Sequence, residues 1–349
     1  MTTLQIISFD SCGRAALSAG IGKKLMNSGR KVGYIKPIHI IGEGAKDDCQ
    51  DAIFIKEALE LDEDVKQLCP MHLSQEELWK NLTEDIDNFA TKVKTSCNQV
   101  AAGKDLLIVE SPGNIKSDQV SALACYTIAE KTDAAVIMVL CPSDYKDAGA
   151  LQAAEKLEKR LLGVIINQVP ESRVSFIRSE SSEYFKARNT TVLAVLPESR
   201  ALLGVSVAEL AAALNGEIIS SKDKVNDLVE NVMLGAMTPD SGRDYFNRKK
   251  NKAVITRAER ADMLLAALET STKCLIVTKQ KPTTSVMVKA EDKHVPVMVV
   301  DKDINDIVAG VELALAKARF QNLQKLQVMV SLLDAGLDIK ALSAALGLK

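Results

Sequence analysis

The chain has 349 residues, of which 47% are hydrophobic and 26% charged, and its formal net charge is −2. This composition is typical of a globular protein with enough apolar residues for sizeable cores, and at about 150 residues per domain it predicts two domains. The 44 basic residues are balanced by 46 acidic ones and only 4% of residues are aromatic, which argues against a nucleic-acid-binding surface.

The N-terminus and the cysteines bear on where the protein is found. Residues 1–5 carry neither the basic stretch nor the apolar stretch of a secretory signal, and no apolar run approaches the ~20 residues that cross a bilayer. The seven cysteines are odd in number, scattered and without a CxxC pair. We therefore expect a cytoplasmic protein with reduced thiols, no disulfide framework and no structural zinc site.

Short apolar segments alternate with helical patterns over residues 1–219. The predicted strands are residues 4–8, 32–35, 106–109, 135–140, 163–166 and 192–196, of which the third is stopped by Pro112. The predicted helices include one that ends at residues 28–29 and those at 52–60, 76–98, 119–131 and 146–161. Apolar strands that do not alternate with polar residues, separated by helices, predict a mostly parallel α/β sheet flanked by helices on both faces.

A polar segment at residues 220–224 predicts a domain boundary, after which the alternation restarts. Strands at 254–255, 274–277 and 295–300, with helices at 258–269 and 283–293, predict a smaller α/β domain over residues 220–310. Residues 311–349 are expected to form a helical tail, broken at residues 334–336. One face of the tail is apolar, and it either packs on its own domain or forms a dimer contact; its residues are Leu323, Leu326, Val330 and Leu333.

The turn after the first strand occupies the place of a phosphate-binding loop, whose motif is G-x-x-x-x-G-K-S/T. In the register of residues 8–15 only Gly13 matches, because Ser8 replaces the first glycine, Arg14 the lysine and Ala15 the hydroxyl residue. Alanine cannot bind Mg²⁺, whereas arginine keeps the positive charge. We expect either an ordinary strand–helix turn or a loop that still binds an anion, without efficient phosphoryl transfer. The candidate phosphate-binding residues here are Ser11, Gly13 and Arg14.

Further segments occur in a recognisable order over nearly all of residues 1–219. They are VGYIKPI at 32–38, DDCQDA at 47–52, LCP at 68–70, LIVESPG at 107–113, LGVIINQVP at 162–170 and VLPE at 195–198. Together they resemble the dethiobiotin-synthetase-like P-loop ATPases, and most of all the version fused to the N-terminus of long phosphotransacetylases.

The resemblance implies roles for several charged and polar residues. Lys36 would face phosphate or substrate, Asn167 would contact adenine, and Asp48 or Asp51 together with Glu110 would hold Mg²⁺. Carboxylates near strand ends are suitable ligands for such a cation. The alternative for these charged residues is a solvated position in a surface loop. The Ser-Pro-Gly that follows Glu110 departs from the small, Gly-rich residues usual in the family.

The second predicted domain resembles the DRTGG domain, which follows the ATPase-like domain in long phosphotransacetylases. The matching segments are residues 232–237, 253–256, 260–270, 275–278 and 295–300. Glu259-Arg260 stands where the family has Asp-Arg, and residues 278–280, Thr-Lys-Gln, stand where it has Thr-Gly-Gly. The resemblance implies a regulatory ligand-binding or dimerising module, and the alternative is a solvated loop. The candidate ligand residues are Glu259, Arg260 and Thr278.

The function that follows is a regulatory or scaffolding protein whose degenerate nucleotide-binding domain senses a nucleotide or an anionic metabolite. We expect a homodimer or a protein partner, ATP or ADP with Mg²⁺ as the cofactors implied by the resemblance, and no nucleic acid or membrane. One alternative is a Mg-ATP-dependent ligase of the dethiobiotin or cobyrinic acid a,c-diamide synthase type, and another is a structural fusion that binds no ligand. No phosphotransacetylase catalytic domain is recognised, so we expect no acetyl transfer.

Overall fold

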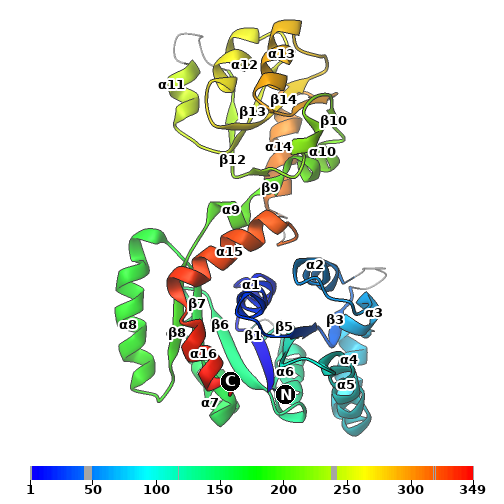
Figure 1. The fold of residues 1–349 in the computed structure, drawn as a ribbon, viewed down its shortest axis with the longest axis vertical. Coiled ribbons are helices and arrows are strands. Elements are labelled where there is room, and N and C mark those ends of the chain that lie inside the picture. Colours follow the sequence, from blue (N-terminus) through cyan, green and yellow to red (C-terminus); the bar gives the residue numbers. More distant parts are fainter. Residues whose placement is uncertain are drawn as a thin grey trace. The chain divides into compact units, whose positions relative to one another are not determined.

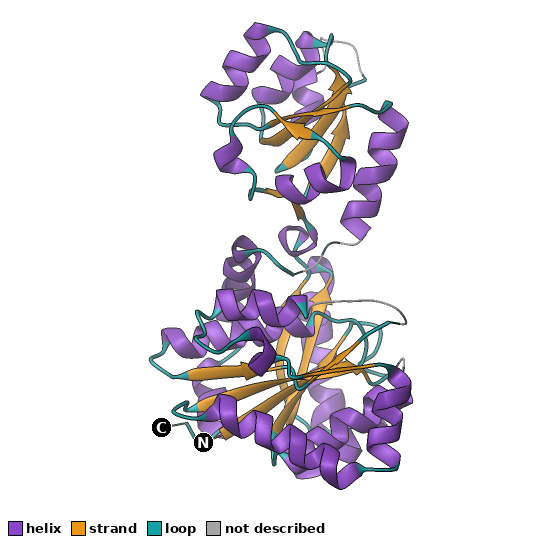
Figure 2. Ribbon diagram, turned by 90° about the vertical axis from the view of Figure 1, so that its right-hand side faces the viewer, coloured by secondary structure: helices purple, strands orange, loops and turns teal. Residues whose placement is uncertain are grey.

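The computed structural model describes residues 2–42, 49–116, 118–236, 242–316, 318 and 320–348. It divides the chain into two units, of which unit 1 comprises Met1–Glu198 with Leu326–Lys349 and unit 2 comprises Ser199–Lys325. In each unit helices cover both faces of a mostly parallel sheet, which confirms the predicted α/β architecture (Figure 1 and Figure 2). No helix in this described part of the chain is long and apolar enough to cross a bilayer.

Unit 1 is built on a six-stranded sheet with the order β2-β5-β1-β6-β7-β8, in which every neighbouring pair is parallel. The strands are β1 (Thr2–Ser8), β2 (Val32–Ile35), β5 (Leu106–Asn114), β6 (Ala135–Leu140), β7 (Leu161–Val169) and β8 (Val192–Pro197). A second small sheet pairs β3 (Ile38–Ile40) with β4 (Met71–Leu73). Because all six long strands run the same way, their carboxyl ends meet at one edge of the sheet.

Helices fill the connections of unit 1. They are α1 (Arg14–Asn27), α2 (Gln50–Ala58), α3 (Val65–Leu68), α4 (Gln75–Thr83), α5 (Ile86–Ala101), α6 (Gln119–Lys131), α7 (Ala148–Leu157) and α8 (Val174–Lys186), with 3₁₀ turns at Glu158–Arg160 and Glu171–Arg173. Helices α6, α7 and α8 share one apolar cluster with the sheet. The single helix predicted over residues 76–98 is wrong, because Asp85 leaves the helical conformation and separates α4 from α5.

Strand β5 continues past Pro112, where the sequence predicts that it stops. The register between β1 and β5 shifts between Ile6 and Ser8, so residues 111–113 lie in an irregular part of the ladder. A bulge of this kind accepts a proline, because no ladder hydrogen bond is required from the missing N–H. The consequence is that Glu110 lies within a buried strand and not in a surface loop.

The C-terminal helices α15 (Leu323–Gly336) and α16 (Ile339–Ala345) follow unit 2, and from Leu326 onward they belong to unit 1. A Cβ atom on Gly20 of α1 would lie 2.7 Å from both Leu333 and Met329, so this glycine permits the close approach of α1 and α15. Lys24 and Asp334 form an ion pair beside that contact. From Leu326 onward the apolar face of the tail therefore packs within unit 1, the first of the two predicted alternatives, whereas Leu323 is exposed.

Unit 2 contains a five-stranded sheet with the order β10-β15-β14-β13-β12, parallel except for β10. Its main strands are β10 (Glu217–Ile218), β12 (Asn231–Leu234), β13 (Lys252–Arg257), β14 (Thr272–Thr278) and β15 (Val297–Val300), and β9 (Val205–Ser206) pairs separately with β11 (Leu228–Val229). The helices are α9 (Arg200–Leu203), α10 (Val207–Leu214), α11 (Gly242–Asn247), α12 (Ala261–Leu268), α13 (Thr284–Asp292) and α14 (Ile304–Ala316), with a 3₁₀ turn at Lys222–Lys224.

The division of the structure differs from the expected boundaries at residues 219/220 and 310/311. Strand β10 pairs with β15, and α10 shares an apolar core with α14 through Leu210, Leu214 and Ile307. Residues 199–219 and the whole of α14 therefore belong to unit 2. The polar segment at residues 220–224 is a surface turn of that unit, which explains why its composition resembles a linker.

We predict that Leu333→Ala lowers the free energy of unfolding by about 2–4 kcal/mol, because it removes a fully buried side chain from the contact with α1. The matched change Gln327→Ala, at an exposed residue of the same helix that belongs to unit 1, should cost about 0.5 kcal/mol or less. Urea denaturation followed by the fluorescence of Trp79, the single tryptophan, reports on unit 1. Equal losses for both variants would contradict this packing.

Lys252 in β13 is fully buried, and its ammonium group donates to the Thr270 hydroxyl (2.9 Å) and the Ser271 carbonyl (3.0 Å). Burial lowers the pKa of Lys252 to about 8. In the unfolded chain this lysine has the ordinary pKa of about 10.4. Between about pH 8 and 10 the unfolded state therefore binds more protons than the folded state, and the free energy of unfolding rises with pH.

We predict that Lys252→Met raises the free energy of unfolding at pH 7 by about 1 kcal/mol and removes the contribution of residue 252 to the rise between about pH 8 and 10. Lys222→Met, at an exposed lysine of unit 2, should leave that rise in place. Denaturation followed by circular dichroism at a series of pH values gives both quantities. The same pH profile in the Lys252 and Lys222 variants would show that burial does not lower the pKa of Lys252.

Candidate functional site

The carboxyl edge of the unit 1 sheet gathers most of the residues singled out in that part of the sequence. Arg14 is the first residue of α1, Lys36 follows β2, Glu110 lies in β5 and Asp51 lies in the first turn of α2. Ligands of open parallel sheets bind at this edge, because loops from several strands converge there.

These four charged side chains form one network, in which Lys36 and Glu110 are buried and Arg14 and Asp51 are partly exposed. The Lys36 Nζ atom lies 2.6 Å from Asp51 Oδ2 and 3.4 Å from Glu110 Oε1, and Arg14 Nε lies 3.6 Å from the same Glu110 oxygen. The other oxygen of Glu110 accepts a hydrogen bond from the Tyr34 hydroxyl at 3.0 Å. Glu110 and Tyr34 are fully buried. Two cations and two carboxylates make the network neutral, which an enclosed cluster requires because an unpaired buried charge is costly.

The electrostatics fix the protonation state of Lys36 and of Tyr34. Burial by itself lowers the pKa of Lys36, but the carboxylates of Glu110 and Asp51 together raise it above its ordinary value. Burial, followed by the negative charge of Glu110, raises the pKa of Tyr34 well above that of a free phenol. At neutral pH the lysine is therefore an ammonium ion and the tyrosine a hydrogen-bond donor, so neither acts as a general base.

Arg14 is turned toward β5 and not into the loop that precedes it. Its Nη1 donates to the Gly113 carbonyl at 2.6 Å, with Asn114 Oδ1 at 3.4 Å. A lysine in a phosphate-binding loop would instead neutralise the β- and γ-phosphates. The next residue, Ala15, has no hydroxyl for a metal ion, so this helix start lacks both of the side chains that handle Mg-ATP.

The loop between β1 and α1 is closed by its own hydrogen bonds. Asp10 accepts from the Ser11 amide through Oδ1 (2.6 Å) and from the Cys12 amide through its carbonyl (2.8 Å). Asn167 at the end of β7 is buried and donates its side-chain amide to the Cys12 carbonyl at 2.8 Å. Gly13 has φ +81°, and a Cβ there would lie 3.0 Å from the Asn167 amide nitrogen, so only glycine fits without strain.

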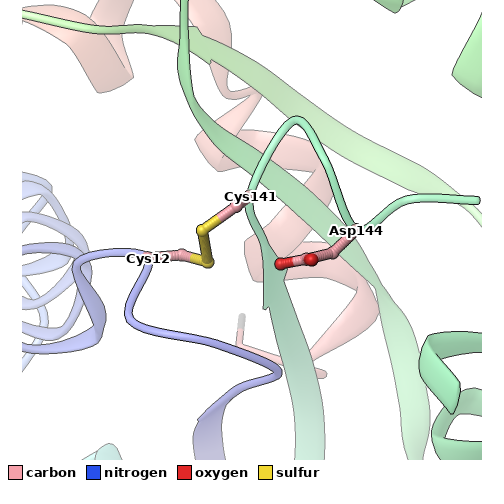
Figure 3. A group of neighbouring side chains, drawn as sticks. All are labelled: Cys12, Cys141 and Asp144. Atoms are coloured by element: carbon pink, nitrogen blue, oxygen red, sulfur yellow. A yellow bond between two sulfur atoms is a disulfide. The ribbon is translucent and has the colours of Figure 1, made fainter. Parts of the chain in front are cut away.

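A disulfide between Cys12 and Cys141 also holds this loop, with the two Cα atoms 5.4 Å apart (Figure 3). The expectation of reduced thiols is therefore wrong for this pair. The two cysteines are 129 residues apart in sequence and meet because β1 and β6 are neighbours in the sheet. Sequence spacing carries no sign of such a contact.

Two further buried thiols lie close to Lys36, and sequence reasoning gave them no role. Cys49 is the residue before α2 and Cys69 follows α3. Their mutual hydrogen bond is the main reason that the pKa of Cys49 is lowered and that of Cys69 is raised. The only sequence signal was that both lie in segments that carry the family resemblance.

The metal candidates are only partly placed. Asp48 lies outside the described residues, whereas Asp51 and Glu110 both approach Lys36. Of the phosphate candidates, Arg14 and Lys36 meet through Glu110. The Ser11 hydroxyl accepts a hydrogen bond from the Asn114 side chain at 3.0 Å. Asn167 donates to the Cys12 carbonyl, so both of these candidates contact the loop between β1 and α1 and not the charged network.

Unit 2 contains a cavity of about 650 Å³ at the carboxyl ends of β13, β14 and β15. Within it Lys279 Nζ lies 2.8 Å from Asp303 Oδ1, and Gln280 donates to Glu259 at the rim. Arg257 has no ion-pair partner in the part of the chain that the structure describes, which leaves its guanidinium available. The lining residues are Arg257, Glu259, Thr278, Lys279, Asp303, Ile304 and Asn305.

The cavity includes two of the three candidates predicted for this unit, Glu259 and Thr278. Arg260 does not line it and forms a two-pronged ion pair with Asp262, at 2.9 and 2.8 Å. Lys279 has φ +61°, a left-handed conformation that favours glycine. This backbone conformation explains why the family has a glycine at position 279. In this chain Lys279 adopts the same conformation and adds a positive charge to the cavity.

Comparison with known families agrees with this architecture. A model described as AAA domain matches residues 3–205, more than half of the chain, and a model described as DRTGG domain matches residues 209–314. The chain therefore belongs to the AAA domain family and carries a DRTGG domain after it. This confirms the resemblance to a dethiobiotin-synthetase-like P-loop domain followed by a DRTGG domain.

The chain is similar to phosphate acetyltransferases. The enzyme of Pseudomonas aeruginosa is 23% identical over 273 residues and that of Haemophilus influenzae 23% over 284, in each case over 73% of this chain and 38% of the relative. The chain thus spans little more than a third of the length of these relatives.

Among solved structures, MinD of Aquifex aeolicus matches 58% of this chain and 84% of its own, at 20% identity and a TM-score of 0.37. The CBS and DRTGG domains of a Clostridium perfringens pyrophosphatase, complexed with its activator diadenosine tetraphosphate, match 44% of this chain and 74% of their own, at 13% identity and a TM-score of 0.28.

We predict that Glu110→Gln lowers the free energy of unfolding by about 3 kcal/mol, because it leaves buried Lys36 and partly exposed Arg14 without their shared carboxylate. The matched control Glu60→Gln removes an exposed partner of Lys23 and should lower it far less. Urea denaturation followed by Trp79 fluorescence measures both. A loss no larger for Glu110 than for Glu60 would show that the network does not stabilise unit 1.

Proposed function

We propose that this protein is a regulator that senses a nucleotide or another phosphate-bearing metabolite in the cavity of unit 2, while unit 1 is a nucleotide-binding fold without turnover. The observation that carries the proposal is the contrast between the two groups of cations. Arg14 and Lys36 in unit 1 are already bound to carboxylates, whereas Arg257 in unit 2 has no ion-pair partner among the described residues.

The argument against turnover in unit 1 is energetic. A phosphate group would have to displace Asp51 or Glu110 from Lys36, and it would also compete with Asp10 for the amides of the loop. Mg²⁺ would need the same two carboxylates that now neutralise the cations. With Ala15 in place of a hydroxyl residue, the metal also loses a ligand that phosphoryl transfer normally uses.

The argument for a ligand in unit 2 rests on size, charge and accessibility. A cavity of about 650 Å³ lies in the range of about 300–1,000 Å³ usual for small-molecule sites. Arg257 supplies a planar fork that suits a phosphate, and Thr278 also lines the cavity. The Lys279–Asp303 pair is 60% and 76% exposed, and such pairs contribute about 0–1 kcal/mol, so a phosphate oxygen can replace Asp303 at little cost.

The second candidate function is a Mg-ATP-dependent ligase. It is favoured by one observation, the meeting of Lys36, Asp51 and Glu110 at the carboxyl edge of the sheet beside the start of α1. In a ligase these residues would have to separate and hold Mg-ATP. The homodimer, a protein partner and the cytoplasmic location stay predictions of the sequence. From the relatives we also propose that this protein acts in the same metabolism as phosphate acetyltransferases.

We predict that at least one phosphate-bearing probe raises the melting temperature of the full chain without Mg²⁺. The probes are ATP, ADP, acetyl phosphate and diadenosine tetraphosphate, each with and without Mg²⁺. A ligand at 100 times its Kd stabilises the folded state by about 2.7 kcal/mol. Arg257→Ala should reduce this shift by at least half, whereas Arg248→Ala, at an exposed arginine of unit 2 that does not line the cavity, should preserve it.

Two other results would contradict the proposal. A response to ATP that requires Mg²⁺ and survives Arg257→Ala would favour the ligase. The absence of any shift with all four probes would contradict sensing of this ligand class and favour the structural fusion.

A further inference from the structure

Cys12, Cys141 and Asp144 form a compact group that the proposed function does not use. Cys12 lies in the loop after β1, and the other two residues lie in the loop after β6. One ligand atom from each residue, a sulfur or a carboxylate oxygen, lies within 4.8 Å of the others. Cys12 and Asp144 are buried, and Cys141 is partly exposed, which leaves a route from solvent. In Figure 3 the Asp144 carboxylate is directed toward the two sulfur atoms.

Asp144 has one carboxylate oxygen in use and one without a partner. Its Oδ1 accepts from Lys116 Nζ at 2.8 Å, while Oδ2 is buried and has no hydrogen-bond donor among the described residues. Asp144 is only 1% exposed, so this oxygen is also kept from water. An unsatisfied buried carboxylate oxygen is costly, and a cation beside the sulfurs would remove that cost.

We propose that Cys12 and Cys141 in their reduced form, together with Asp144, bind a thiophilic divalent cation of the Zn²⁺ class, and that the disulfide is the metal-free oxidised form. Two thiolates and a carboxylate are suitable ligands for Zn²⁺, with a fourth, tetrahedral position left for water. The two positive charges of the cation offset the two thiolates, and Lys116 offsets Asp144, although it also lies 3.5 Å from the Asp10 carboxylate.

The conversion between the two forms exchanges two electrons with a disulfide oxidant such as glutathione disulfide. The sulfurs of Cys12 and Cys141 form one S–S bond, the oxidant's S–S bond breaks, and its two sulfurs take two protons to become two thiols. The cation then leaves because a disulfide sulfur is a far weaker ligand than a thiolate. The other carboxylate oxygen stays bonded to Lys116, which keeps Asp144 in place for the return reaction.

The test is a metal titration of the reduced full chain under anaerobic conditions. Co²⁺ serves as the coloured probe for a tetrahedral thiolate site, and Zn²⁺ is titrated in competition with a chromophoric chelator. We expect the reduced protein to bind one equivalent, and glutathione disulfide to release it as two protein thiols disappear. Asp144→Asn should weaken binding at least ten-fold, and Cys12→Ser should weaken it further and reduce the thiolate-to-Co²⁺ absorption band to that of one thiolate.

The matched control is Cys49→Ser, which removes one thiol of the other buried pair and should leave the stoichiometry and the absorption band unchanged. Asp144→Asn is nearly isosteric, so it tests the site even if Cys12→Ser does not fold. The proposal is overturned if the reduced protein binds no Co²⁺, if Asp144→Asn binds as tightly as the unmodified chain, or if the absorption band falls in Cys49→Ser and is unchanged in Cys12→Ser.

Discussion

The buried carboxylate of Glu110 is the constraint on which the rest of unit 1 depends. It lies inside β5 with no access to water, so its charge has to be neutralised by side chains delivered from elsewhere. The end of β2 supplies Lys36, and the start of α1 supplies Arg14. Asp51 from α2 then balances the second cation. The charge of Glu110 thus requires the end of β2 and the starts of α1 and α2 to lie close to β5.

The family resemblance and the apolar patterns were enough to predict the architecture. Strands such as β2, β6 and β8 are covered on both faces, so their sequences are continuous apolar runs that are easily recognised. Elements such as β9 and β10 have two residues each and are held by pairing with distant strands, so no local pattern marks them. The same long-range pairing places residues 199–219 in unit 2, although a polar segment follows them in sequence.

The candidate site was predictable as a set of residues but not as a set of contacts. The family resemblance selected Lys36 and Glu110, and the two meet because the ends of parallel strands lie at one edge of the sheet. Which charge pairs with which depends on side-chain direction, and nothing local indicates that Arg14 turns toward Gly113 or that Asp10 occupies the loop amides. The contact of Cys12 with Cys141 likewise follows from strand order, which spacing in the sequence does not reveal.

Arg14 stands where a phosphate-binding loop has its lysine, and its contacts with β5 explain why it does not face that loop. A guanidinium has several donors in one plane, so it can bond to the Gly113 carbonyl while its Nε faces Glu110, which a single ammonium group on a shorter stem does less well. Arg14 is therefore held by β5 and forms part of the neutral network. An anion entering unit 1 must compete with the ion pairs that Arg14 and Lys36 already form, whereas at Arg257 it breaks no ion pair that the described residues form. This contrast supports the proposal that a phosphate-bearing ligand binds in unit 2.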